Sequence, residues 1–571
     1  LGLNFELNEF VEGLAAEAYI TFDNYSYLRQ QLRNDYPTYS IDRYLNAAGD
    51  EEIRFTERKK LNLPKKQSIA SNSTYRYFGW NARVKYNRSF GLHDMGANAA
   101  FRYTAEEATG SSQDLKEGNF TFRANYAYNK RYMLEATLAA MGSNRFQGDN
   151  KYFFAHSVGG AWIISNESFL KDMKAVNLLK MKVSYGHLGY AGDTDFFLHR
   201  TNWRQGDKEE FKPSTGANTT DLIRLGNPDL KWEKTGQFDI GFDLGLFNNR
   251  LRLTADYYYK KTTDLLYNVA IPSASGYDSM LKNIGSVQNK GYELSIESDN
   301  LSGAFSWTTA FNISFNRNKV LELGGETYKD VGTYDDHLKT SDIRRLIVGQ
   351  PIGVFYGYRF DGIFQNEAEC AQQTSSPSPI GVGLRRYKDL NGDGKIDATN
   401  DREILGDANP KFFGGMTNTF AYKGFELNVF LQYSYGNKIF NYNAMELESP
   451  TGGQNVYQDL VNRWTPTNPS NEYQKATTNR NNIVSDRFIE DGSFLKLKTV
   501  SLSYSFPKLN WKHIGGLRLY VTGQNLLTWT KYRGYDPEVS YRGASTLEAG
   551  EDFGGYPQAR TFMFGIKLDI K

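Results

Sequence analysis

The sequence has 571 residues, and 39 Tyr, 37 Phe and 8 Trp give it an aromatic content of 15%. Its 67 Lys and Arg balance 65 Asp and Glu, which argues against a nucleic-acid partner held by bulk electrostatics. The single Cys, Cys370, excludes a disulfide framework and a cysteine-based zinc site, and no apolar run approaches the roughly 18 residues that a transmembrane helix needs.

Apolar and polar residues alternate along much of the chain. Residues 14–22 place Leu, Ala, Ala, Ile and Phe at every second position, and residues 238–246 and 562–570 repeat the pattern. A period of two puts alternate side chains on opposite faces of a strand, so the pattern predicts an almost all-β chain. We expect about nineteen strands, over residues 1–9, 14–25, 75–88, 91–104, 118–129, 132–141, 155–164, 179–186, 234–247, 250–262, 285–299, 303–317, 343–348, 352–361, 411–422, 425–436, 494–506, 516–524 and 560–570.

The length of these segments decides between two β architectures. Strands of soluble sandwiches usually have about five or six residues, whereas most of these have roughly ten to fourteen, near what a tilted strand needs to cross a bilayer. Their polar faces carry full charges, such as Arg83 with Lys85 and Asp239 with Asp243, and their apolar faces often end in an aromatic residue. An apolar outside with aromatic girdles and a polar inside is typical of outer-membrane barrels. We therefore predict a transmembrane antiparallel β-barrel, with a large soluble β protein as the alternative.

The links between the expected strands alternate between short and long. Residues 423–424 form a link of two residues, whereas 437–493 and 525–559 are long excursions. In an outer-membrane barrel the short turns face the periplasm and the long loops face the exterior. The alternation therefore assigns the long links to the cell surface.

The same alternation fixes the direction of each strand. Strands 303–317 and 352–361 must both run outward, so a returning strand has to lie between them, and residues 343–348 with the tight turn at 349–351 supply it. Strand 1–9 then runs inward. Because bacterial barrels have an even strand number, and because no signal peptide is seen, we expect residues 1–571 to be the C-terminal portion of a longer barrel protein.

The most specific local motif spans residues 389–397. Oxygen-bearing side chains at positions one, three, five and nine, with glycine at six, match a calcium loop of the EF-hand type. The match departs at its end, where Asn400 and Asp401 stand in place of the usual Glu. We expect a structural Ca²⁺ ion, and a metal-free turn held by Asx hydrogen bonds is the alternative. The candidate ligands are Asp389, Asn391, Asp393, Lys395 (through its carbonyl), Asp397 and Asp401.

Aromatic residues in the long links are candidate ligand contacts. A ring lying over a sugar face buries apolar C–H surface, and neighbouring Asn and Asp side chains can fix hydroxyl groups. The alternative for each ring is packing within the loops or against a partner. The candidates are Trp203, Tyr277, Tyr334, Tyr457, Trp464 and Tyr535, with Tyr328, Tyr473 and Tyr541 as further exposed-loop aromatics.

No catalytic constellation is present in the sequence. It contains no G-x-S-x-G nucleophile elbow and no P-loop or Rossmann phosphate motif. The pairs Arg344-Arg345 and Arg385-Arg386 are expected to be solvated or to line the lumen rather than to clamp a ligand. We therefore predict that the protein is not an enzyme.

Several stretches resemble the SusC/RagA family of TonB-dependent outer-membrane transporters of Bacteroidota. The resemblance covers nearly the whole chain, in order. It is carried by Asn227-Pro228-Asp229-Leu230-Lys231-Trp232-Glu233, by the segment from Asn283 to Leu294, by Gly349-Gln350-Pro351-Ile352-Gly353, by the Asp389 loop with Asn409-Pro410, and by Phe488 to Leu497.

The resemblance implies a 22-stranded barrel in the outer membrane, filled by an N-terminal plug. It also implies active import of oligosaccharides or peptides, energised through TonB and assisted by a SusD-like surface lipoprotein. Two other classes stay open: a non-transporting adhesin or structural barrel, and a secreted Ca²⁺-binding glycan hydrolase or lectin.

Overall fold

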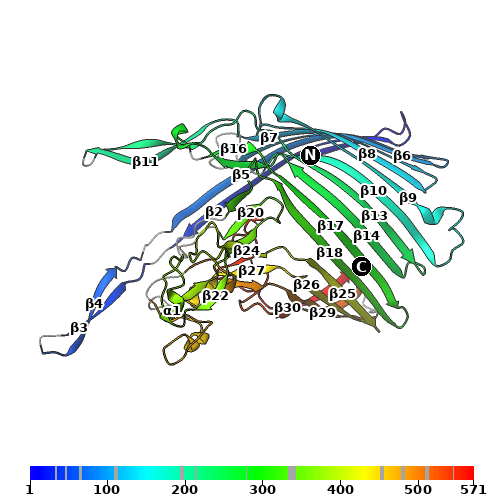
Figure 1. The fold of residues 1–571 in the computed structure, drawn as a ribbon. Coiled ribbons are helices and arrows are strands. Elements are labelled where there is room, and N and C mark those ends of the chain that lie inside the picture. The colour runs from blue at the N-terminus through cyan, green and yellow to red at the C-terminus, as the bar shows by residue number, and fades with distance from the viewer. Residues whose placement is uncertain are drawn as a thin grey trace.

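The computed structural model shows a large antiparallel sheet that curves into the wall of a barrel (Figure 1). The structure describes residues 1–570 apart from 33–34, 46–47, 64–66, 109–113, 193–197, 213–214, 278, 332–342, 450–454, 478–481, 508–512, 540 and 544.

The wall has 17 strands, and each pairs with the next wall strand along the chain. The strands are β1 (Gly2–Glu6), β2 (Leu14–Gln31), β5 (Ser68–Phe90), β6 (His93–Ala108), β7 (Leu115–Tyr128), β8 (Tyr132–Ser143), β9 (Tyr152–Ile163), β10 (Val176–Tyr190), β13 (Glu233–Leu246), β14 (Leu251–Thr263), β17 (Ser286–Leu301), β18 (Phe305–Glu322), β25 (Phe412–Tyr422), β26 (Phe425–Tyr435), β29 (Phe494–Ser505), β30 (Ile514–Thr530) and β32 (Thr561–Ile570).

Two expected wall strands lie elsewhere, which corrects the count of about nineteen. Residues 343–348 and 352–361 contain β20 (Arg344–Ile347) and β21 (Val354–Tyr358), which pair with β19 (Tyr328–Val331) and β24 (Arg402–Asp407) in a separate sheet. β18 pairs directly with β25 instead. With four and five residues, β20 and β21 are too short to cross a bilayer. Because expected strands alternate in direction and two consecutive ones are removed, the direction predicted for every other strand is unchanged.

The remaining elements lie outside the wall. Three hairpins, β3–β4, β11–β12 and β15–β16, were not predicted, and the first two project beyond the wall on its long-loop side (Figure 1). No helix in the described part of the chain is long and apolar enough to span a membrane. These elements are β3 (Thr38–Leu45), β4 (Glu51–Lys59), β11 (Asn202–Lys212), β12 (Thr215–Arg224), β15 (Leu266–Ala270), β16 (Ser279–Asn283), β22 (Phe360–Ile363), β23 (Arg385–Tyr387), β27 (Lys438–Asn441), β28 (Ile489–Asp491), β31 (Glu551–Asp552), α1 (Glu367–Cys370), α2 (Tyr442–Leu447) and the 3₁₀ turns Gly148–Lys151, Ile164–Asn166, Ser273–Ser275, Gln458–Asn462 and Asp486–Phe488.

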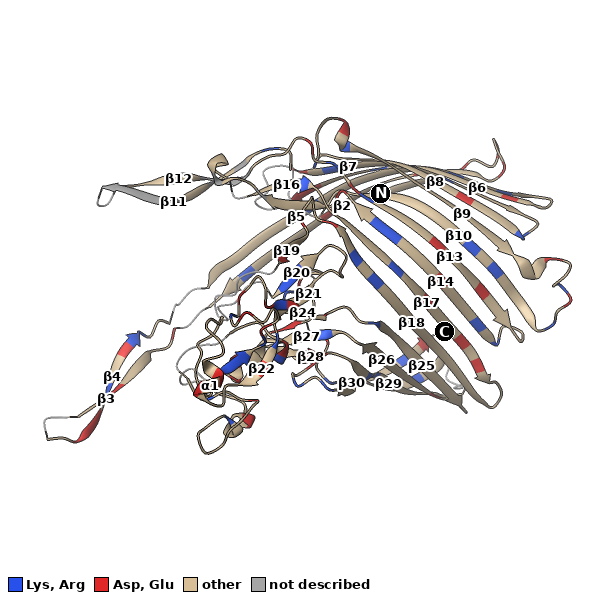
Figure 2. Cartoon of the chain, in the orientation of Figure 1, with Lys and Arg blue, Asp and Glu red and all other residues tan. Residues whose placement is uncertain are grey.

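The two faces of the wall differ as the period of two predicts. On β10 and β13, Val183 lies opposite Ile240, and both are exposed on the outward face. The adjacent pair, Ser184 and Asp239, lines a cavity on the concave face. Charged residues are spread along the wall strands (Figure 2). The sheet is therefore apolar outside and charged inside.

Short turns join the strands at one end of the wall. Residues 423 and 424 form the predicted two-residue link between β25 and β26, with φ values of 44° for Lys423 and 86° for Gly424. Two successive residues with positive φ are what a type I′ turn requires, and its twist matches that of the flanking strands. This link confirms the prediction of a tight turn there.

At the other end, three long excursions pack into one body, here called the loop body, which comprises the described residues within 343–411, 436–491 and 531–560. Its hydrophobic core is fully buried and includes Phe355, Phe440, Tyr442, Met445 and Phe488. Strand β27 pairs with both β28 and β31, which joins the second and third excursions. The long links are therefore folded structure and not loose loops.

A charge on the outward face tests the orientation of the wall. Ile240→Arg puts a cation at the middle of β13, where contact with lipid costs about 2–4 kcal/mol. We expect that loss in the free energy of unfolding, measured by urea titration in phospholipid vesicles. Ser184→Arg on the inward face of β10 is the matched control and should cost much less. Equal losses in the two variants would contradict the assignment of faces.

A buried ion pair tests the coherence of the loop body. Arg344 Nε lies 2.8 Å from Glu551 Oε1, and these side chains are only 1% and 2% exposed. Glu551→Gln leaves the guanidinium buried without its counter-ion, which costs about 3–5 kcal/mol. We expect faster amide hydrogen exchange in β20 and β21 and unchanged exchange in the wall. Glu297→Gln, which breaks the exposed pair with Arg252, should change neither.

Candidate functional site

Two of the predicted aromatic residues lie around one ion-pair cluster on the loop body. Tyr535 is 79% exposed, and Tyr457 is half-buried against the core of the loop body. Arg533 contacts Glu448 at 3.1 Å and Glu490 at 2.8 Å, and these three charges and Tyr535 all act on the Tyr457 hydroxyl. Burial raises the pKa of that hydroxyl, so Tyr457 stays a neutral donor. The cluster thus combines an accessible ring with fixed charges and a hydroxyl group.

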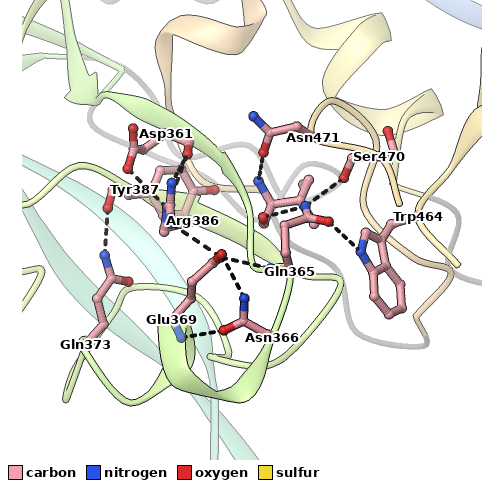
Figure 3. Close-up of polar contacts among 11 residues, drawn as sticks. Asp361, Gln365, Asn366, Glu369, Gln373, Arg386, Tyr387, Trp464, Ser470 and Asn471 are labelled. Atoms are coloured by element: carbon pink, nitrogen blue, oxygen red, sulfur yellow. Dashed lines mark hydrogen bonds and ion pairs between the residues drawn. The ribbon is translucent and has the colours of Figure 1, made fainter. Parts of the chain in front are cut away.

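Trp464 has a different setting (Figure 3). Its indole N–H donates to Gln365 Oε1 at 3.1 Å, and Gln365 in turn donates to the carbonyl of Ser470 at 3.0 Å. Asn471 accepts the backbone N–H of Ile363 at 2.9 Å, which ties the same two segments together. The polar edge of Trp464 is therefore used within the loop body, and its contact with ligand stays a prediction.

The other aromatic candidates are not gathered at this cluster. Trp203 is 57% exposed on β11, in a hairpin that projects away from the loop body (Figure 1). Tyr277 is half-buried in the link between β15 and β16, and Tyr334 lies outside the described residues. Tyr328 stacks on the Arg345 guanidinium at 4.0 Å. The structure thus brings together Tyr457 and Tyr535 of the predicted set.

The Asp389 loop lies on the loop body, and its carboxylates accept backbone hydrogen bonds. Asp389 accepts the N–H groups of Gly392 and Gly394, both at 2.7 Å. Asp401 is fully buried and accepts those of Leu390 and Asp397, both at 2.8 Å. Backbone N–H groups of residues 400 and 399 hold the pKa of Asp397 below its usual range. These bonds fix the path of the loop.

The candidate ligands of the Asp389 loop meet the requirements of Ca²⁺ only in part. All candidate ligands offer oxygen, as Ca²⁺ requires. Within the described residues, which include all of 389–401, no three His, Cys, Asp or Glu side chains gather in a way that could hold a metal ion. Asp393 also accepts the N–H of Lys395 at 2.8 Å. The Ca²⁺ ion therefore stays a prediction, since the hydrogen bonds of the metal-free alternative are all present.

Three of the four arginines expected to be solvated or lumenal, Arg344, Arg345 and Arg385, are buried, which corrects that prediction. Arg344 and Arg385 are each 1% exposed. Arg344 pairs with Glu551, and Arg385 donates to Ser449 Oγ at 3.1 Å. Folding supplies each of the three guanidinium groups with hydrogen-bond or ion-pair partners, and these offset part of the cost of burial.

The attachment of the third excursion to the wall was not predicted from the sequence. Lys496 of β29 is buried and donates to Asp536 and Glu538, both at 2.6 Å. Burial opposes ionisation of Glu538, but the hydrogen bonds from Lys496 and Lys498 outweigh it and hold the pKa of that carboxyl below its usual range. The only sign of this contact in the sequence is a Lys within a strand that is long enough to cross a bilayer.

The concave face of the wall carries a cavity of about 1140 Å³ with charged walls. Its charges are largely paired: Lys182 contacts Asp243 at 3.3 Å and Asp256 at 2.9 Å, and Arg123 contacts Glu135 at 2.6 Å. Such a surface suits a polar solute or a polar protein segment and is unsuited to lipid.

Comparisons with known proteins agree with this geometry. Residues 21–363 match the family model described as "TonB dependent receptor-like, beta-barrel". The chain is 36% identical to TonB-dependent receptor P3 of Formosa agariphila over 523 residues, which cover 85% of this chain and 51% of that protein. It is 27% identical to TonB-dependent receptor SusC of Bacteroides thetaiotaomicron over 542 residues, which cover 86% and 51%. The chain thus spans about half the length of these curated relatives.

The fold also matches a solved structure, that of the RagAB peptide transporter. The TM-score is 0.75 at 23% identity, and the match covers 98% of this chain and 60% of the other. This likeness supports the wall with its loop body as the fold. The chain therefore belongs to the TonB-dependent receptor-like β-barrel family of the outer membrane and, within it, to the SusC/RagA type.

Proposed function

We propose that this chain forms the wall and outer mouth of a transporter that actively imports oligosaccharides or peptides across the outer membrane. The observation that carries the proposal is the combination of a charged concave face with a folded loop body at the outer end of the wall. A sheet that only anchors a surface protein needs the apolar outside but has no use for a cavity lined by ion pairs.

The partners follow from the same proposal. TonB would supply energy through a plug segment, and a SusD-like surface lipoprotein would cover the outer mouth. Support comes from the names of similar proteins, a TonB-dependent receptor SusC and the RagAB transporter. The ion-pair cluster around Arg533, with the exposed ring of Tyr535, is the part of the mouth best suited to hold a polar oligomer.

Uptake by cells tests the transport role. We expect that cells with the intact gene accumulate either a fluorescein-labelled maltodextrin mixture or a fluorescein-labelled casein hydrolysate, and that a proton uncoupler or deletion of the gene abolishes the accumulation. Tyr535→Ala should weaken uptake several-fold, because an exposed ring contributes contact and little stability. Trp464→Ala should instead lower the thermal stability of the loop body.

Two outcomes would contradict the transport role. If deletion leaves the uptake of both probes unchanged but removes adhesion to a surface, the adhesin alternative is correct. If the protein is recovered from the culture medium and not from the outer-membrane fraction, the secreted alternative is correct.

We also propose a structural Ca²⁺ ion in the Asp389 loop, on the strength of its ligand spacing. Asp393 is exposed, and the hydrogen bonds of Asp389 and Asp401 hold the loop without it. Asp393→Ala should therefore abolish a Ca²⁺-dependent rise in melting temperature while changing the melting temperature in EDTA little. Asp401→Ala, which leaves the Leu390 and Asp397 N–H groups unsatisfied, should destabilise the loop in either buffer. If Ca²⁺ fails to raise the melting temperature of the unaltered protein, the loop is a metal-free turn.

A further inference from the structure

A second cavity, of about 590 Å³, lies where the wall meets the loop body. Its volume falls within the range of about 300–1000 Å³ that is usual for ligand pockets. The wall strands β10, β13, β14, β17 and β18 form its floor, and residues of β15, of β20 and of the third excursion form its roof.

The floor is one cross-strand row of the sheet. In register across the five strands, the row runs through Leu188, Thr235, Thr262, Val287 and Val320. The two threonine hydroxyls lie 2.9 Å apart and bond to each other, while their methyl groups add to the apolar surface. The floor is therefore apolar in character although it faces inward.

The neighbouring row on the same face shows that an apolar row is unusual on the inside of this wall. Two residues further along each strand, the row reads Gly186, Gln237, Lys260, Asn289 and Asn318. This row is polar, as expected for the inside of a membrane barrel. The apolar row matches the elements above it, and at one end Val320 is buried against Leu346 of the loop body.

The roof is aliphatic. Leu266, Leu323, Leu346 and Leu547 close over the floor. The ring of Tyr267 is also present, but the ammonium group of Lys329 lies over its face at 4.1 Å. Leu, Ile and Val are the commonest residues of the lining, which also includes Tyr190, so the cavity suits a branched aliphatic group.

Carboxylates outnumber available cations around the cavity. Glu233, Glu322 and Glu326 line it together with Lys260 and Lys329. Lys329 already donates to the carbonyl of Asn268 at 3.0 Å. Among the ion pairs of the described chain, none engages Glu322 or Glu326, and both side chains are exposed. Three carboxylates thus line the cavity against two ammonium groups, which leaves its surroundings negative by one charge.

We propose that this cavity binds an aliphatic group that carries a protonated amine, as the N-terminal Leu, Ile or Val residue of a peptide does. The proposal rests on the proposed import function and narrows its substrate class to peptides with such an N-terminus. The apolar row holds the side chain, and the carboxylates of Glu322 and Glu326 attract the ammonium group.

Calorimetry on the intact receptor, purified from the outer membrane in detergent, tests the site with three probes. Leucine amide should bind. N-acetyl-leucine amide has the same side chain without the cation and should bind at least about tenfold more weakly, a loss of about 1.4 kcal/mol. Maltotriose should not compete with leucine amide.

Two variants separate the two parts of the site. Thr262→Trp fills the cavity from its floor and should abolish binding of leucine amide. The double variant Glu322→Gln/Glu326→Gln keeps the shape and should weaken leucine amide several-fold while leaving N-acetyl-leucine amide unchanged. Glu472→Gln, an exposed carboxylate of the loop body outside the cavity, is the matched control. Heat-modifiable migration on electrophoresis shows that each variant has folded.

The results test the proposed binding site and the proposed import function separately. If leucine amide does not bind the unaltered receptor, or binds Thr262→Trp equally well, the site is refuted, and energised uptake of either labelled oligomer would still support import. If binding is lost in Thr262→Trp but no uptake depends on the gene, the site stands and the import function fails.

Discussion

Inside a bilayer no water is available to bond with the backbone, and the rest of this structure depends on that constraint. Each N–H and C=O group at membrane depth must find its partner in a neighbouring strand. The wall strands pair in chain order, with every pair antiparallel, so that within the described residues each strand between β1 and β32 has a neighbour on both sides. Once the backbone hydrogen bonds between neighbouring strands are fixed, only the side chains can vary. Those facing lipid must be apolar, whereas those facing inward are free to carry charge.

This constraint also explains why the candidate ligand-binding residues of the loop body gather at one end of the wall. Tight turns such as Lys423–Gly424 leave no room for additional structure at the other end. The long excursions can fold only where they leave the membrane, and there they build a core around Phe355 and Phe440 with its own short strands. The exposed Tyr535 and the charges around Arg533 are thus held on a packed support.

Prediction from the sequence succeeds where the rule that determines the structure is local. A period of two is visible within one strand, so most wall strands were found, and the two-residue turn needed only its neighbours. It fails for 352–361 because a strand buried on both faces inside the loop body also reads as an apolar run. Residues 343–348 were then assigned to the wall only because a returning strand was needed before 352–361. The burial of Arg344 could not be foreseen, since its counter-ion Glu551 lies 207 residues away along the chain. The spacing of the Asp389 loop is ambiguous for a different reason: the same side chains that would bind Ca²⁺ also bond to backbone N–H groups and shape the turn.

The two parts of the molecule meet in the apolar cavity, and its geometry depends on both. The register of the wall alone sets the floor, so the row through Thr262 cannot shift without breaking the ladders. The roof belongs partly to the loop body, where Leu346 lies two residues from Arg344 and Leu547 lies four residues from Glu551. The buried ion pair therefore joins the two segments that bear these roof leucines. Leu346 and Leu547 also belong to one hydrophobic cluster, so the roof of the cavity depends on the same contacts that hold the loop body together.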